Sequence, residues 1–179
     1  MNSQSKSHSI TVGALILLLV LLALGAFFGG GAFLLAPDGH LIQMPISHLT
    51  NSPFHDFLIP GALLFAFLGV YPTAVAYSLW RRPAWRWPDH INPFRQFHWC
   101  WAATLAAGVI VIAWISTEMV WVPFGLVHLL YLGWGALLVT LTLHPEVRRY
   151  CARGVPAMQT GLPVGLQRGQ PADSEGGTR

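Results

Sequence analysis

Histidines and carboxylates gather in two segments of the chain that separate long apolar runs. The first segment covers residues 37–56, and the second lies around residues 118–128. The residues of interest are Asp38, His40, His48, His55, Asp56, Glu118 and His128. Imidazole and carboxylate groups bind zinc or copper, or relay protons, when a fold brings them together. We name this set the outer-face polar cluster, and it predicts a metal or proton site on one face of the molecule.

A hydrated loop with ordinary polar residues is the alternative for the outer-face polar cluster. The six residues between His48 and His55 match no strict zinc-ligand spacing. Asp56 is also well placed to help start a helix, near the positive end of the helix dipole. The sequence leaves both interpretations open.

Glu118 is expected at the C-terminal end of a helix, where a carboxylate opposes the helix dipole. The chain has no Lys or Arg between residues 96 and 147, so only a histidine could offset this negative charge. His128 is the favoured partner, because its helix follows that of Glu118 after a short connection. The alternative is a solvated glutamate that marks the end of the helix.

A second group of candidate ligands, the inner-face set, consists of His98, Cys100 and His144. In antiparallel neighbouring helices His98 and His144 would lie at similar depth, and two facing histidines are one way to bind haem in a bundle. Interfacial histidines are also ordinary amphipathic residues. Quinone binding needs less sequence specificity and stays open, so the sequence specifies no cofactor.

The two cysteines predict no disulfide framework. Cys100 and Cys151 are far apart in the sequence and form no CxxC motif. The chain also lacks a serine nucleophile elbow, a zinc-protease motif, a phosphate-binding loop and a dinucleotide fingerprint. No charged residue lies clearly at the middle of an apolar run, which makes a channel or pump less favoured than a scaffold or accessory protein.

Composition decides which elements must position these residues. Hydrophobic residues make up 54% of the 179 residues and charged residues 9%, whereas a soluble domain carries about 25% charged residues. Such a chain cannot cover a water-facing surface with polar side chains, which excludes an ordinary water-soluble globular protein. Its longest charge-free runs each contain at least about 20 residues, enough to cross a hydrocarbon core of about 30 Å.

The predicted fold class is all-α, an integral membrane antiparallel bundle of four transmembrane helices within residues 10–150. The expected spans are residues 11–36, 58–80, 96–117 and 122–143. Residues 1–9 form a short N-terminal segment. Residues 151–179 are rich in glycine, proline and polar residues, and we expect a disordered tail there.

Prolines indicate where the third and fourth helices begin and end. Asn92-Pro93 is typical of an N-cap followed by the first residue of a helix, and Pro123 can open the fourth helix. Pro145 disfavours the helical conformation at His144, so the fourth helix is expected to end there.

Prolines also predict an irregular second helix. A straight helix from Pro53 to Trp80 would be longer than one crossing requires. We therefore expect residues 52–59 to form an interfacial turn, a bend at Pro60-Gly61, and a further kink at Pro72.

The basic residues predict the orientation. All ten Lys and Arg residues precede the first expected span, lie between the second and third, or follow the fourth. Four spans place them on one face, and the positive-inside rule puts that face, with both termini, in the cytoplasm. The basic residues form no stripe interleaved with aromatic side chains and match no nucleic-acid motif, so no nucleic-acid partner is predicted.

Small residues predict where the helices approach one another. Gly25-x-x-x-Gly29 on the first helix is the clearest such motif. Lipid gives leucine burial no driving force between helices, so small residues that allow close approach matter more. Packing within the chain is the favoured role of this motif. A homo-oligomer or a larger membrane complex through the same helix faces is the alternative, besides the lipid bilayer itself as partner.

The first connection and the second helix resemble a known group of proteins. Residues 37–39 read Pro-Asp-Gly, and residues 49–65 read Leu-Thr-Asn-Ser-Pro-Phe-His-Asp-Phe-Leu-Ile-Pro-Gly-Ala-Leu-Leu-Phe. This pattern resembles small, uncharacterised bacterial four-helix membrane proteins that are loosely called DoxX-like. The resemblance implies a multi-pass protein of the bacterial plasma (inner) membrane, and it carries over no catalytic residue.

Three functional hypotheses follow. The favoured one is an inner-membrane protein of structural, accessory or small-ligand-binding type. The first alternative is a subunit of a membrane oxidoreductase that binds quinone or haem. The second alternative is a metal- or pH-responsive sensor that uses the outer-face polar cluster.

Overall fold

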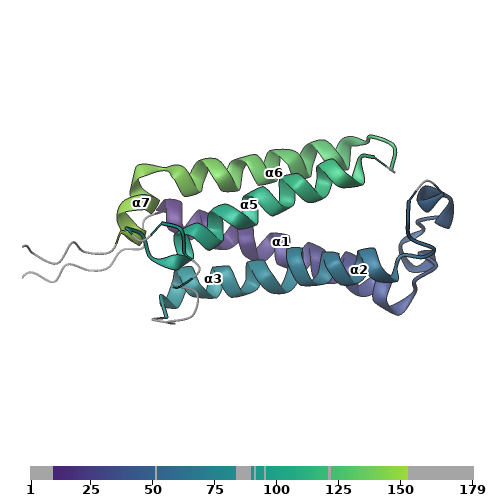
Figure 1. Ribbon diagram of the computed structural model, residues 1–179, viewed down its shortest axis with the longest axis horizontal. Helices are drawn as coiled ribbons and strands as arrows, with labels where there is room; N and C mark the ends of the chain where they lie inside the picture. The colour runs from purple at the N-terminus through teal and green to yellow at the C-terminus, as the bar shows by residue number, and fades with distance from the viewer. Residues whose placement is uncertain are drawn as a thin grey trace, which may run out of the picture.

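The long helices of the chain run antiparallel to one another (Figure 1). The computed structural model describes residues 10–50, 52–83, 90, 92–94, 96–120 and 122–152. The expected N-terminal segment 1–9 and residues 153–179 of the expected tail lie outside the described residues. The helices are α1 (Ile10–Leu35), α2 (Leu58–Leu64), α3 (Tyr71–Arg81), α5 (Trp99–Glu118), α6 (Leu126–Leu143) and α7 (Pro145–Cys151).

The second long helix has three parts. α2 continues without a break into the π-helical segment η3 (Phe65–Val70) and then into α3. The connection from α1 to α2 holds two short 3-10 helices, η1 (His40–Ile42) and η2 (Ile46–Leu49). Counted this way, the described residues contain four helices long and apolar enough to cross a membrane. They contain helices and no named strand.

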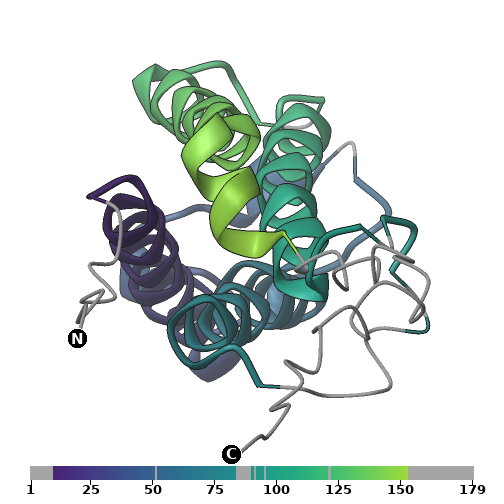
Figure 2. The ribbon, with the colours of Figure 1, turned by 90° about the vertical axis from the view of Figure 1, so that its left-hand side faces the viewer.

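The helices pair as two hairpins. One hairpin consists of α1 with α2, η3 and α3, and the other consists of α5 with α6 (Figure 1). The hairpins meet at the end where α1 begins, where α7 packs against α1, α5 and α6 and lies over the bundle (Figure 2). We name this the arginine end, because Arg81, Arg82, Arg148 and Arg149 lie there.

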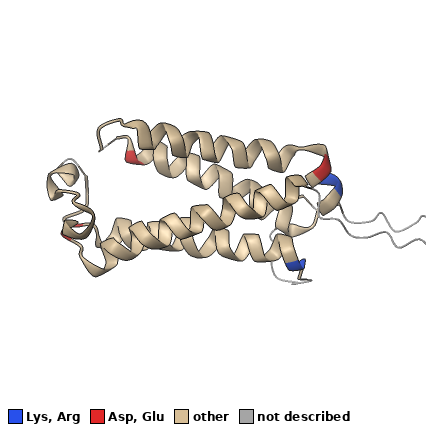
Figure 3. Cartoon of the chain, turned by 180° about the vertical axis from the view of Figure 1, so that it is seen from behind, with Lys and Arg blue, Asp and Glu red and all other residues tan. Residues whose placement is uncertain are grey.

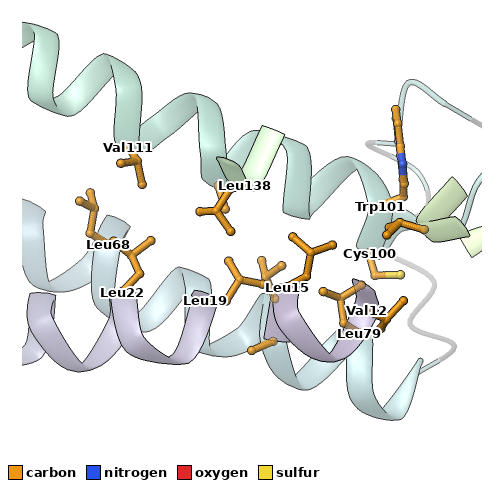
Figure 4. Packing of buried hydrophobic residues seen from close by; sticks show 14 of the residues in the cluster. Val12, Leu15, Leu19, Leu22, Leu68, Leu79, Cys100, Trp101, Val111 and Leu138 are labelled. Atoms are coloured by element: carbon orange, nitrogen blue, oxygen red, sulfur yellow. The ribbon is translucent and has the colours of Figure 1, made fainter. Parts of the chain in front are cut away.

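The core is strongest in the half of the bundle near the arginine end. Val12, Leu15 and Leu19 are fully buried and lie on one face of α1, at a spacing of three and four residues. They point toward Leu79 of α3 and Leu138 of α6, which are equally buried (Figure 4). The opposite half of the bundle has fewer such contacts, and a cavity opens there.

In each hairpin, one pair of glycines lets the two helices approach closely. A Cβ on Gly108 of α5 would lie 3.1 Å from the carbonyl oxygen of Gly135, and a Cβ on Gly135 would lie 3.1 Å from that of Gly108. Between α1 and α2, a Cβ on Gly30 would lie 2.9 Å from the carbonyl oxygen of Gly61. The backbones are therefore in direct contact at both crossings, as small residues at helix interfaces permit.

The third and fourth helices start later than the prolines predicted. α5 begins at Trp99 instead of following Asn92-Pro93. The Asn92 side chain instead builds a turn: its oxygen accepts from the Phe94 N–H and its nitrogen donates to the Phe97 carbonyl. α6 begins at Leu126, so Pro123 lies in the connection. It ends at Leu143, immediately before His144-Pro145.

The second helix begins at Leu58, where the expected span 58–80 begins, and irregular structure precedes it. Pro60 lies in the first turn of α2, where a missing N–H leaves no helical hydrogen bond unmade. Pro72 follows directly after η3, and a π-helical turn is one way in which a helix accommodates an irregularity in its hydrogen bonds.

Candidate functional site

A cavity of about 380 Å³ lies between the two hairpins, at the end opposite the arginine end. We name this the cavity end. Its walls come from α1, α2, η3, α5, α6 and the connection that contains η1 and η2. Most of the lining is apolar, and it includes Leu22, Ala26, Phe33, Leu64, Leu68 and Ile115.

The sequence of α1 explains part of the open space. Gly25 and Gly29 lie one helical turn apart and both line the cavity. A Cβ on Gly25 would lie 3.4 Å from the hydroxyl of Tyr131, and one on Gly29 would lie 3.6 Å from Leu64. The Gly25-x-x-x-Gly29 motif therefore lines the cavity and leaves volume where larger side chains would fill it.

The connection between α1 and α2 closes one side of the cavity. Its Phe57 is buried and stacks on Phe33 of α1, with ring centroids 4.6 Å apart. The Phe57 N–H donates to the carbonyl of Pro37 at 2.9 Å, and Leu49 packs into the same small cluster. Gly39 has a φ of +77°, a conformation that a residue without Cβ adopts at low cost. The connection is thus a packed cap.

His128 is the most buried polar residue of the cavity wall, with 7% of its surface exposed. Its Nδ1 accepts from the N–H of Gly125, at 3.2 Å, and so caps the start of α6. In the neutral ring the proton is therefore on Nε2. Nε2 is buried and, within the described part of the chain, has no hydrogen-bond partner.

Glu118 lies on the same wall, at the last residue of α5. It is half-buried, and Trp114 and His128 are the neighbours that interact with its carboxyl group. Within the described residues, no hydrogen bond or ion pair joins Glu118 to His128 directly. The structure thus brings this sequence-predicted pair to one cavity without a direct contact.

The rest of the outer-face polar cluster lies apart from these two residues. His40 Nδ1 and an Asp38 carboxylate oxygen lie 2.6 Å apart on the surface. The hydrogen bond from His40 lowers the pKa of Asp38 below its ordinary value. Asp56 accepts from the N–H of Leu58, at 3.0 Å, and so helps to start α2. His48 is half-buried and His55 is exposed.

The predicted cluster is therefore divided into an exposed pair and a cavity pair. Among the residues that the structure describes, no group of three or more His, Cys, Asp or Glu side chains is arranged to hold a metal ion. Of the described residues 38–56, Asp56 helps to start α2 and the Asp38–His40 pair lies on the surface, apart from the cavity pair.

The inner-face set lies at the arginine end, where both histidines start helices. His98 Nδ1 accepts from the N–H of Cys100 at the start of α5, at 3.3 Å. His144 Nδ1 accepts from the N–H of Glu146 at the start of α7, at 3.4 Å. Sequence reasoning considered them as haem ligands and missed this capping role, which Ser, Thr, Asp or Asn usually fill.

Cys100 does have a partner that the sequence did not indicate. Its sulfur lies 3.7 Å from that of Cys151, and both residues are buried and carry free thiols. The N–H of His98 donates to the Cys151 carbonyl at 2.7 Å, which holds the end of α7 beside the start of α5. The hydrogen bond from Cys100 and the positive charge of Arg82 lower the pKa of Cys151.

Charge is distributed unevenly between the two ends (Figure 3). The cavity end carries Asp38, Asp56 and Glu118, whereas the described arginines lie at the other end together with Glu146. The full sequence has no Lys or Arg between residues 7 and 80 or between residues 96 and 147. All cavity-lining residues fall within these two stretches, so none of them is a Lys or Arg.

Comparison of the chain with family models, curated proteins and solved structures finds no match. Its site must therefore be interpreted from its own geometry. Sequence reasoning missed Tyr131 as a member of this site. Tyr131 lies three residues after His128 on α6, and that spacing places both side chains on one helix face.

Proposed function

We propose that the chain is a multi-pass membrane protein that binds a small, largely apolar molecule in the cavity. The surfaces of the four long helices support a membrane environment. Only 22% to 39% of the most apolar window of each helix is buried inside the molecule, so most of its hydrophobic side chains face outward. Those side chains are stable against lipid and costly against water.

Burial of His128 is the observation that carries the binding proposal. A buried N–H without an acceptor costs about 1–3 kcal/mol, so native proteins rarely leave one unmade. His128 lines an open, mainly apolar cavity, while its Nε2 is covered by neighbouring atoms and becomes available to a ligand when the ring moves. A ligand oxygen that accepts from it would remove this cost, while the apolar wall would bind the rest of the ligand.

Cavity size and composition support the same proposal. Ligand sites commonly enclose about 300–1,000 Å³, with mainly apolar walls and a few convergent polar groups. The volume of about 380 Å³ lies within that range, and the polar groups of the wall include His128, Glu118 and Tyr131. The packed cap and the glycine-containing face of α1 form two of the cavity walls.

Substitution of a cavity glycine tests this proposal. Gly29→Leu fills part of the cavity, whereas Gly31→Leu on the same helix adds a side chain where no atom lies within 4 Å. We expect the neutral photolabel 4-methylbenzophenone to attach to Met44 or Leu22 of the cavity wall in the wild type and in Gly31→Leu. Mapping of adducts by mass spectrometry should show labelling reduced about fivefold or more in Gly29→Leu. Equal labelling of the two variants would contradict the proposal.

A quinone-binding oxidoreductase subunit is the second candidate function. The supporting observation is again the Nε2–H of His128, because a quinone ring presents a carbonyl acceptor and an apolar body. Decylubiquinone should then compete with 4-methylbenzophenone for the cavity. Undiminished labelling at saturating decylubiquinone would count against this candidate and leave the general proposal intact.

Orientation and compartment belong to the same proposal. The arginine end is assigned to the cytoplasm by the positive-inside rule, which puts the cavity at the outer boundary of a bacterial plasma membrane. In that arrangement a ligand would reach the site from the outer leaflet or from the outer aqueous phase.

A further inference from the structure

We infer that the cavity selects a lipophilic ammonium ion that also carries an oxygen acceptor, with the positive group against Glu118 and the oxygen bound by the Nε2–H of His128. This inference rests on the proposed ligand cavity and names the chemical class of the ligand. It depends on the charge of the wall, the burial of His128 and the absence of Lys and Arg from the cavity-forming stretches of the sequence.

At the cavity end, Glu118 is a carboxylate that no Lys or Arg of the cavity wall faces. Asp38 is bound by His40, and Asp56 accepts from the backbone of Leu58. Both of these carboxylates are therefore engaged outside the cavity wall. Glu118 is the acidic residue of the wall itself, and it has no ion pair within the described residues. A ligand with a positive charge would supply the counter-charge and favour the ionised carboxylate.

Anionic ligands are disfavoured by this wall. An anionic head group, such as that of a fatty acid, would need a Lys or Arg partner inside an apolar cavity. The stretches of sequence that form the cavity contain neither residue. An anion would instead meet Glu118, and two like charges in a poorly hydrated site repel strongly. The wall therefore discriminates by charge as well as by shape.

His128 adds a preference for an oxygen acceptor. The Nδ1 of His128 is occupied by the N–H of Gly125, so the neutral ring has only its Nε2–H to offer a ligand. Nε2 is covered by neighbouring atoms in the structure, so its N–H reaches a ligand in the cavity when the ring of His128 moves. A simple hydrocarbon amine would leave this donor unsatisfied, whereas an amine with a carbonyl, ether or hydroxyl oxygen would satisfy it.

Three matched photolabels test the charge preference. The probes are 4-(aminomethyl)benzophenone, which is protonated at neutral pH, neutral 4-methylbenzophenone and anionic 4-benzoylbenzoate. All three share the ketone acceptor and the aromatic body, and the ketone attaches to nearby C–H bonds on irradiation. Purified protein in a non-ionic detergent is labelled at equal probe concentrations. The signal is the yield of adducts on cavity residues above that of Gly29→Leu, which corrects for partition into the micelle.

In the wild type, we expect the ammonium probe to label the cavity about tenfold more than the anionic probe, with the neutral probe between them. In Glu118→Gln, which keeps the size of the side chain, the ammonium probe should fall to the level of the neutral probe. Far-UV circular dichroism and a thermal unfolding temperature like those of the wild type show that the variant is folded. An ammonium advantage that survives in Glu118→Gln would overturn the inference, as would equal labelling by all three probes in the wild type.

The role of the acceptor is tested without a substitution. 4-Benzylbenzylamine has a methylene group in place of the ketone and otherwise matches the ammonium probe. As a competitor it should be about tenfold weaker than unirradiated 4-(aminomethyl)benzophenone, and equal potency would contradict the role of His128. The proposed function fails separately: in that case no probe labels the wild type above Gly29→Leu.

Discussion

Three histidines of this chain cap helices with their Nδ1 atoms. His98 caps α5, His144 caps α7, and His128 accepts from the backbone of Gly125 at the start of α6. An Nδ1 that accepts a backbone N–H leaves the proton of the neutral ring on Nε2. Capping thus makes the other ring nitrogen the donor, and at His128 that nitrogen is buried without a partner among the described residues.

Part of this residue-scale picture could be predicted from the sequence. The shortage of cations around Glu118 identified His128 as its neighbour, because charge balance is visible in the order of residues. The contact between Cys100 and Cys151 could not be predicted, since 51 positions separate them and only the docking of α7 brings them together. The capping roles were missed because histidine is an uncommon residue at that position.

In the connection between α1 and α2, the exposed pair of Asp38 and His40 predicts a pH dependence of stability. The hydrogen bond from His40 lowers the folded-state pKa of Asp38 below its ordinary value of 3.8. A carboxyl group with a lowered pKa stabilises the fold above the unfolded-state pKa, and this contribution is lost as the pH falls through the folded-state pKa. The pair therefore contributes at neutral pH and not in strong acid.

Carboxyl ¹³C NMR on aspartate-labelled protein measures this pKa directly. We expect Asp38 to titrate below 3.8 in the wild type and to move up toward that value in His40→Gln. An Asp38 resonance that titrates identically in both proteins would show that the pair does not form in solution.

At the scale of elements, the four long helices were predictable and their ends were not. Each helix occupies an apolar run that is long enough to cross a membrane as a helix. The ends depend on local hydrogen bonds instead: Asn92 builds a turn where an N-cap was expected, and Pro123 lies before the helix that it was expected to open. Proline and asparagine suit both helix starts and turns, so the sequence does not distinguish the two.

The crossing of α5 and α6 gives a prediction about stability. A Cβ on Gly135 would lie 2.7 Å from Ile112 and 3.1 Å from the carbonyl oxygen of Gly108, so one of the helices must move. Gly135→Ala should therefore destabilise the fold by about 1–3 kcal/mol, the usual cost of overpacking.

Gly133→Ala on the same helix is the matched control. No atom lies within 4 Å of a Cβ there, so the change should raise stability by about 0.5–1 kcal/mol through helix propensity alone. Thermal unfolding of both variants in detergent gives the comparison. If both melt at the wild-type temperature, the close contact between the two hairpin helices is not present in solution.

At the scale of the whole molecule, the two ends have different tasks. The arginine end is closed by α7 and by the strongest part of the core, which holds the two hairpins together. At the cavity end the same hairpins enclose the cavity, and the connection between α1 and α2 covers one side of it. A cavity of this kind could not be predicted from the sequence. It depends on how the two hairpins pack against each other, and the apolar composition of each hairpin does not determine that packing.

Orientation in the membrane is the last prediction. The cavity end should face outward and the arginine end should face the cytoplasm, because the basic residues of the chain lie on the arginine side of the four spans. Single cysteines at His55 and His90 test this in a background that lacks Cys100 and Cys151. Both histidines are exposed, and they lie on opposite sides of the span formed by α2, η3 and α3. An impermeant maleimide should label His55→Cys in intact cells and His90→Cys only after the membrane is permeabilised. The reverse pattern would place the cavity in the cytoplasm and would require that its ligand come from the cell interior.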